Sequence, residues 1–196
     1  MNYMAWEVVV PRGGCTLSTI RNVDTQQRID MARGRTGALA GTFPTDAELH
    51  MNPDFPKDVK LFDQISSFDD FLVCSPKLSA FLQTLELPQV EALPVTIVDH
   101  EGKVASKDYS IIYPYSVQDC IDREASKLEW NVIDPELISA VFKLVLDQSK
   151  IDPAIPVFRP AHFARAVFVR EDIAEQISAQ GLKGPDMTPL DDDWAR

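Results

Sequence analysis

The sequence predicts an α+β fold with a mostly antiparallel sheet and a few flanking helices, and three observations lead to this prediction. Short runs of β-branched and aromatic residues alternate with turn residues along the chain. Two of these runs are joined by a Gly-bearing turn, which indicates a β-hairpin. Apolar residues recur at helical spacing in two other segments. With 196 residues and 45% hydrophobic content, the chain is long and apolar enough to build a core as a single domain.

The first strand is expected at "YMAWEVVV", because this run is β-branched and aromatic and ends at a proline. Residues 11–60 are rich in glycine and proline, so we expect mostly loop there, with a short element possible around "TQQRIDMARG". We therefore interpret 1–196 as a single domain. In it, 1–60 form an irregular N-terminal part with one strand, and 61–190 form an α+β core.

The predicted core begins with a short strand over 69–75 and a helix over 76–87, whose leucines recur at helical spacing. Next come two strand-like runs, 90–99 and 109–117, on either side of the turn "DHEGK". They predict a hairpin. The prolines within these runs are expected at strand edges or bulges, because proline cannot donate to a strand ladder.

The remaining segments are less uniform. "PELISAVFKLVLDQSKI" is ambiguous, because it has a helical stripe while "AVFKLVLD" also alternates as a strand. Residues 164–170 predict a strand. Residues 170–184 predict a helix that begins with acids and ends near Gly181, where a left-handed C-cap is wanted. The end of the chain, 184–196, is expected to be an irregular tail.

The chain is acidic, with a formal net charge of −11 from 30 acids and 19 bases. A basic face that grips phosphate is therefore not expected, and we predict neither a nucleic-acid nor a membrane partner. Three widely spaced cysteines without a CxxC pattern argue against a disulfide framework. The N-terminus lacks the pattern of a secretory signal, and no apolar run is long enough to span a bilayer. These observations favour a cytoplasmic location.

A search for chemistry gives little. The histidines lack metal-site spacing, no nucleotide-binding motif occurs, and we predict no metal and no cofactor. Cys120 lies between carboxylates, which make a thiol a poorer nucleophile, so we interpret it as a core residue. Asp119 and Asp122 could share one helical face as an acid–base pair. The simpler interpretation is that one of them caps a helix while Arg123 and Glu124 pair locally.

Three longer stretches carry a family resemblance: "FDDFLVCSPKLSAFLQTLELPQVEALPVTIVD", "YSIIYPYSVQDCIDREAS" and "FRPAHFARAVFVREDIAEQISAQGLKGPDMTPL". Over about residues 60–190 the chain resembles a bacterial family of immunity proteins from polymorphic toxin systems, once described only as a domain of unknown function. The matching residues include Asp119 with Asp122 and Ser126, and the pair Phe158 and Arg159. The resemblance implies that "AVFKLVLD" is a strand and that "VQDCIDREAS" caps and orients a strand–helix junction.

The resemblance implies a binding protein and not an enzyme. Its expected partner is a cognate toxin, possibly a nuclease-type effector, encoded by a neighbouring gene. Two alternatives stay open: an enzyme using Asp119, Asp122 and Arg159 in a cleft, and a self-associating scaffold such as a homodimer. For the toxin interface we single out charged residues and one aromatic anchor: Asp119, Asp122, Arg123, Glu124, Arg159, Asp191, Asp192, Asp193 and Trp194.

Overall fold

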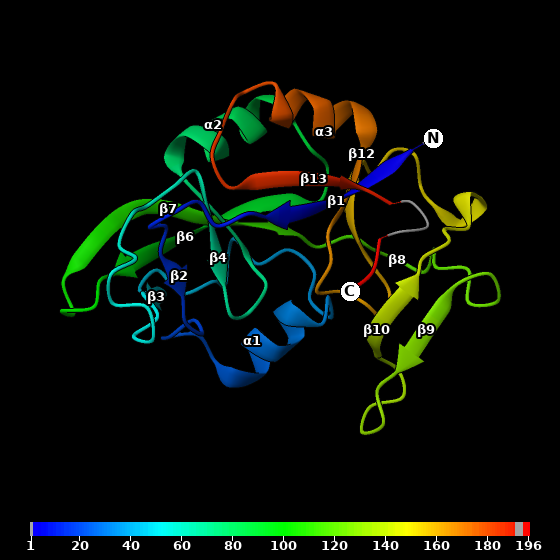
Figure 1. Cartoon of the computed structure of the whole chain (residues 1–196), viewed down its shortest axis with the longest axis horizontal. Helices are drawn as coiled ribbons and strands as arrows, with labels where there is room; N and C mark the ends of the chain where they lie inside the picture. Colours follow the sequence, from blue (N-terminus) through cyan, green and yellow to red (C-terminus); the bar gives the residue numbers. More distant parts are fainter. Residues whose placement is uncertain (1, 191–193) are drawn as a thin grey trace.

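The structure, a computed structural model, describes residues 2–190 and 194–196. Within these residues the strands form three sheets, and three α-helices and one short 3-10 helix, Gln148–Lys150, accompany them (Figure 1). Seven strand pairings are antiparallel and three are parallel. The predicted α+β class is confirmed, although the sheets are mixed and not purely antiparallel. No helix among the described residues is long and apolar enough to cross a membrane.

The largest sheet has six strands in the order β2-β4-β5-β7-β6-β3. Its strands are β2 (Thr16–Leu17), β3 (Glu48–His50), β4 (Gln64–Ser67), β5 (Leu72–Cys74), β6 (Val90–Val98) and β7 (Val104–Pro114). The predicted hairpin is confirmed as β6–β7. The two outermost strands, β2 and β3, pair in parallel with β4 and β6 and come from the N-terminal part of the chain. That part was expected to hold one strand.

The second sheet has five strands in the order β13-β1-β12-β11-β8. They are β1 (Tyr3–Val8), β8 (Val117–Gln118), β11 (Val157–Pro160), β12 (Phe168–Arg170) and β13 (Pro185–Pro189). The expected irregular tail is therefore wrong for β13, which pairs antiparallel with β1 along five residues. Two prolines concealed this strand. They are tolerated because they stand at its two ends and because it lies at the sheet edge.

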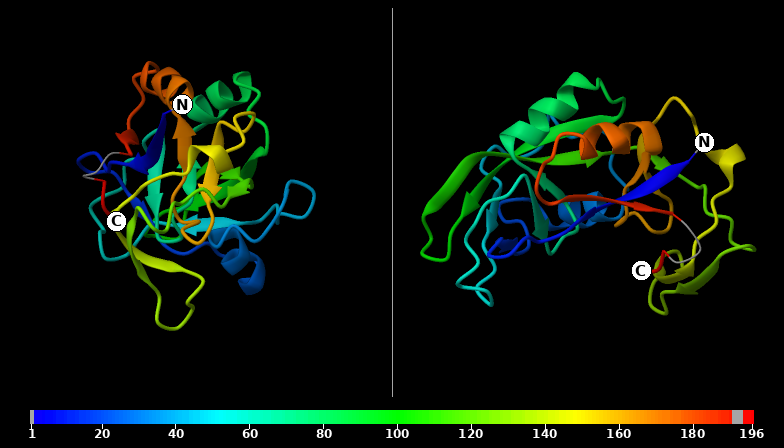
Figure 2. Two further views of the ribbon diagram at one scale, coloured as in Figure 1. Left: turned by 90° about the vertical axis from the view of Figure 1, so that its right-hand side faces the viewer. Right: turned by 45° about the horizontal axis from the view of Figure 1, so that its top comes forward.

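Three α-helices accompany the sheets: α1 (Thr25–Ala32), α2 (Pro76–Thr84) and α3 (Glu171–Ser178). The predicted helices α2 and α3 are confirmed. Ser75 caps α2 by accepting a hydrogen bond from the amide of Leu78, and Gly181 adopts the expected left-handed conformation after α3. Both helices lie on the same side of the molecule (Figures 1 and 2) and share one apolar cluster. Helix α1 forms in the segment "TQQRIDMARG".

The core follows from the alternation of side chains along β7. Ile111 belongs to a cluster with Leu17 and Leu49 of the same sheet and with Met31 of α1, Leu39 and Phe43, so α1 and the loop after it cover one face of the six-stranded sheet. Ile112, the next residue, belongs to the cluster under α2 and α3 on the opposite face. A third cluster joins the five-stranded sheet to the remaining hairpin. Segments from both ends of the chain are therefore needed to bury the sheets.

That remaining hairpin consists of β9 (Lys127–Trp130) and β10 (Ile138–Lys143). It forms a separate two-stranded sheet that projects to one side of the molecule (Figures 1 and 2). The strand interpretation of the ambiguous segment is confirmed over 138–143. Two register irregularities interrupt the pairing, so its alternation was easily read as a helical stripe.

Candidate functional site

The segment "VQDCIDREAS" does not lead into a helix, and that expectation is wrong. After β8 the chain makes a turn in which one carboxylate oxygen of Asp122 accepts hydrogen bonds from the amides of Glu124 and Ala125, both at 3.0 Å. Aspartate stabilises such turns as readily as it caps helices. Ser126 then donates to the carbonyl of Val145 at 3.2 Å and accepts from its amide at 2.9 Å. These two bonds direct the chain into β9.

Two of the predicted interface residues meet beside the loop end of the β9–β10 hairpin, where Trp130 pairs with Ile138. The Arg123 guanidinium lies 3.7 Å from Asp119, 2.7 Å from Nε2 of His162, and over the ring of Trp130 at 5.4 Å. Because Arg123 can only donate, Nε2 of His162 accepts in this arrangement. Nδ1 then carries the proton and donates to the carbonyl of Glu136 at 2.7 Å. The group ties the turn to the hairpin while leaving Asp119 and Arg123 exposed.

Arg159 lies inside the fold and has no surface to offer a partner. Its side chain is 1% exposed, and its guanidinium donates to the carbonyls of Pro114 at 3.1 Å and Ala164 at 2.8 Å. It also lies 5.3 Å from the ring centroid of Tyr113. Burial lowers the pKa of Arg159, with Tyr113 and Asp70 acting in the opposite direction. Arg159 therefore links β7 to the loop before β12.

Trp194 is also buried, at 3% exposure, and is not an exposed aromatic anchor. Its ring packs edge-on against Phe163 and Phe168, and its indole nitrogen donates to Glu7 at 3.2 Å. The rest of the predicted acidic tail, Asp191, Asp192 and Asp193, lies outside the described residues. Among the predicted interface residues that the structure describes, only those between Asp119 and Glu124 lie at the surface.

The carboxylate dyad receives no support from the geometry. Nε and Nη1 of Arg159 donate to backbone carbonyls, and no described hydrogen bond or ion pair joins Arg159 to Asp119 or Asp122. Neither described pocket is lined by these three residues. Cys120 is buried, as expected, and burial raises its pKa to about 11, so the thiol stays protonated at neutral pH. The described residues contain no group of three His, Cys, Asp or Glu side chains able to hold a metal ion.

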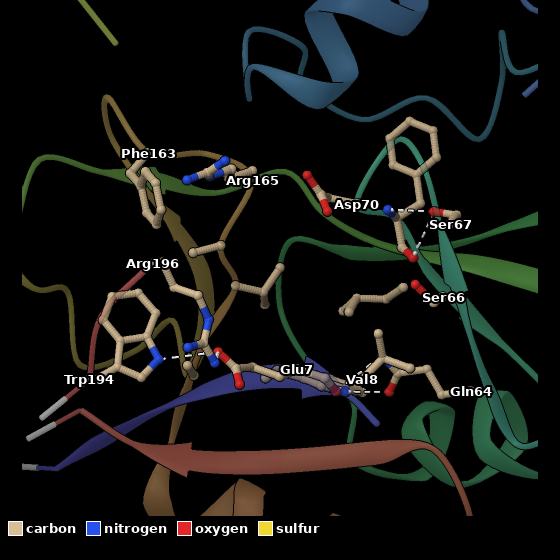
Figure 3. A pocket seen from close by; sticks show the side chains of 16 residues that line it. Glu7, Val8, Gln64, Ser66, Ser67, Asp70, Phe163, Arg165, Trp194 and Arg196 are labelled. Carbon is tan, nitrogen blue, oxygen red and sulfur yellow. Dashed lines mark hydrogen bonds and ion pairs between the residues drawn. The ribbon is translucent and has the colours of Figure 1, made fainter. Parts of the chain in front are cut away.

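One of the described pockets lies between β1, β4 and the loop before β12, with a volume of about 380 Å³ (Figure 3). Glu7, on its floor, is fully engaged: it accepts hydrogen bonds from Trp194 and Thr188 and pairs with Arg196. Asp70 faces the pocket beside Arg165 (Figure 3). Asp70 is an exposed residue, but partial desolvation raises the pKa of its carboxyl, and Arg165 partly offsets this. Glu7 and its partners anchor the end of the described chain. Among the described residues that line this pocket, no nucleophile is hydrogen-bonded to a general base.

Sequence reasoning missed the most exposed apolar residues of the described chain, Val132 and Ile133, which are 97% and 95% exposed. They stand at the tip of the β9–β10 hairpin. Asn131 fixes the tip, because its side-chain oxygen accepts from the amides of Ile133 at 2.8 Å and Asp134 at 3.0 Å. The signal was present in "NVIDPEL", where a connecting loop has β-branched residues in place of the usual polar ones.

Asp134 also holds the tip from the side of α1. Its carboxylate lies 3.1 Å from Arg33 and 3.8 Å from Arg35, both in the segment that follows this helix. The amide of Asn131 donates to the carbonyl of Leu137 at 2.8 Å and closes the loop. The two apolar side chains are therefore presented on an ordered loop.

Comparison with known proteins gives one family. A family model described as immunity protein 43 matches residues 42–195, a range that takes in every element from β3 to β13. Among curated proteins, none matches the chain.

Proposed function

The chain belongs to the immunity protein 43 family, and on this basis we propose that it binds a cognate toxin and neutralises it in the cell that produces both. The single observation that carries this proposal is the family match, which covers most of the chain. A binding role also agrees with the site geometry, where charged and apolar groups are presented on a surface.

The net charge supports a basic target. At −11 the chain attracts positively charged proteins and repels phosphate, so nucleic acid and anionic membranes are unsuitable partners. A nuclease-type toxin fits, because a protein that grips a phosphate backbone has a basic surface. An acidic inhibitor is steered to such a surface by long-range attraction. We place this encounter in the cytoplasm, before the toxin leaves the cell.

The test is a paired growth and co-purification experiment with the protein encoded by the neighbouring gene. That protein is expressed alone and then together with this chain, which has an affinity tag. We expect growth arrest in the first case, and restored growth with a stable complex in the second. Restored growth without a complex would contradict neutralisation by direct binding.

Self-association is a second candidate function, and the exposed tip of the β9–β10 hairpin is the observation that favours it. Light scattering of the purified chain distinguishes the two. A toxin-binding protein with one interface is expected to be monomeric until the toxin is added. A stable homodimer that binds no toxin would favour the scaffold.

A further inference from the structure

We propose that the toxin contacts this chain at the tip surface, which we define as Val132 and Ile133 together with Asp119, Arg123, Trp130 and Glu136. This inference rests on the proposed function and adds the place of contact and the chemistry of the partner. The partner surface that fits is a basic protein surface with an apolar recess, into which the two β-branched side chains insert.

The apolar part of the argument is the exposure of Val132 and Ile133. Single exposed apolar residues are common on protein surfaces and need no explanation. Val132 and Ile133 are different, because they are adjacent and are 97% and 95% exposed, so neither contributes to the core. Burying such a pair on association is favourable, because it removes apolar surface from water.

The tip is also held in place before any partner arrives. Asn131 fixes the loop from inside, Asp134 ties it to Arg33, and His162 donates to the carbonyl of Glu136. An ordered loop loses less conformational entropy on binding than a mobile one, so more of the contact energy appears as affinity.

Below the tip, the hairpin offers residues of the types that dominate protein interfaces. Arg123 lies across Trp130 with its guanidinium 5.4 Å from the ring, and His162 meets the same ring edge-on at 5.8 Å. Arginine and tryptophan are enriched among residues whose truncation abolishes binding. Arg123 is exposed and Trp130 is half-buried, so both have surface available to a partner.

The charge of the same segment selects the partner. Residues 117–139 contain six acidic side chains and two basic ones. Arg33 and Arg35 lie beside one of these acids, Asp134, so a smaller acidic excess remains around the tip. The acids surround the tip along the chain, on both its β8 side and its β10 side. Complementary charge across an interface raises the association rate and excludes wrong partners. A basic toxin is therefore favoured over a second copy of this chain, which would present the same acids to the same acids.

The experiment uses the full chain and the protein encoded by the neighbouring gene. The test variant combines Val132→Ser with Ile133→Ser. The matched control is Phe68→Ser, because Phe68 is 73% exposed and stands alone on the connection between β4 and β5. We expect the test variant to bind at least about 30-fold more weakly and to fail in growth rescue, as for a central contact residue. The control should bind as the unmodified chain does.

A photo-crosslinking amino acid at position 133, and at position 68 as the control, tests the contact without removing it. Crosslinking to the toxin from 133 alone supports the proposal, even if the serine variant folds poorly. If the unmodified chain binds the toxin but the serine variant binds equally well and 133 does not crosslink, the tip surface is wrong while the proposed function stands. If the unmodified chain neither binds nor rescues growth, both fail. Crosslinking of 133 to a second copy of this chain would overturn the partner assignment.

Discussion

The β6–β7 and β9–β10 hairpins differ in what their connecting loops present. The loop between β6 and β7 is "DHEGK", in which a carboxylate oxygen of Asp99 accepts from the amides of Glu101 and Lys103 and Gly102 takes a positive φ. The loop between β9 and β10 has a similar internal cap at Asn131 but exposes valine and isoleucine. One loop is suited to water, and the other is suited to an apolar contact.

The strands of the two hairpins also differ, in how deeply their side chains are buried. Leu93 of β6 and Ile111 of β7 are fully buried and pair across the middle of the six-stranded sheet. In β9 no residue is fully buried, and the hairpin packs on the rest of the molecule along one side only. The comparison teaches that stability and binding can reside in separate hairpins. Changes at the β9–β10 tip should then alter binding at little cost in folding free energy.

The largest expected effect is a core truncation in the first hairpin. Ile111→Ala removes buried methyl groups from the apolar cluster that contains Leu17, Met31 and Leu49, and it should lower the free energy of unfolding by about 2–5 kcal/mol. Urea unfolding measures this, and one transition is expected if the chain is a single domain, as its sequence predicts. The control Val104→Ala, at an exposed position of the same hairpin, should cost less than about 0.5 kcal/mol. An equal loss from the Val132 and Ile133 serine variant would contradict the comparison.

The next effect concerns the base of the second hairpin, where Ser126 before β9 meets Val145 after β10. Ser126→Ala removes both hydrogen bonds to Val145, and we expect a loss of about 1–3 kcal/mol in the local stability of this hairpin. Hydrogen exchange should accelerate over 127–143 and stay unchanged over 90–114. Ser106→Ala, which removes one exposed contact in β7, serves as the control. Faster exchange in both hairpins would show that they do not open separately.

A smaller effect is expected from charge at the tip surface. Asp119→Asn combined with Glu136→Gln removes two acids at the rim of the proposed contact. Rim charges act mainly on the association rate, so this variant should associate several-fold more slowly with the toxin at low salt. The difference should shrink as salt is added, because exposed charges are screened. An unchanged association rate at low salt would remove these acids from the steering surface.

Local sequence patterns predicted the elements whose signals lie within a few residues. The hairpin β6–β7 has alternation and a glycine turn, and α2 and α3 have apolar spacing with recognisable ends. β9 was missed because it is four residues long and half charged or polar. β13 was missed because two prolines flank it, and only its pairing with β1 shows that they stand at a sheet edge.

The site was predictable only in part, for a similar reason. The polar residues from Asp119 to Glu124 were singled out because they are adjacent in sequence, but a helix cap was expected where Asp122 caps a turn. The burial of Arg159 was not predicted, because two of the three carbonyls that accept from it belong to Met31 and Pro114, which are distant in the sequence. The exposure of Val132 and Ile133 also depends on the tertiary structure, because the local sequence does not show whether other parts of the chain cover this loop.

The smallest expected effect is a pH dependence of stability at the connection between β4 and β5. This connection contains the exposed Phe68 and the partly desolvated carboxylate of Asp70. Burial raises the pKa of Asp70, and Arg165 lowers it again in part. A raised pKa means that folding favours the protonated acid. Its stabilising contribution is therefore present below the unfolded pKa and is lost as pH rises through the folded pKa.

The variant Asp70→Asn cannot ionise, and asparagine tolerates the positive φ of this position. The variant should unfold at a slightly higher temperature than the unmodified chain at pH 7, and the difference should vanish below about pH 4. Adding Arg165→Gln to both chains should widen the difference. A variant less stable at pH 7 would show that attraction to Arg165 outweighs the cost of burial.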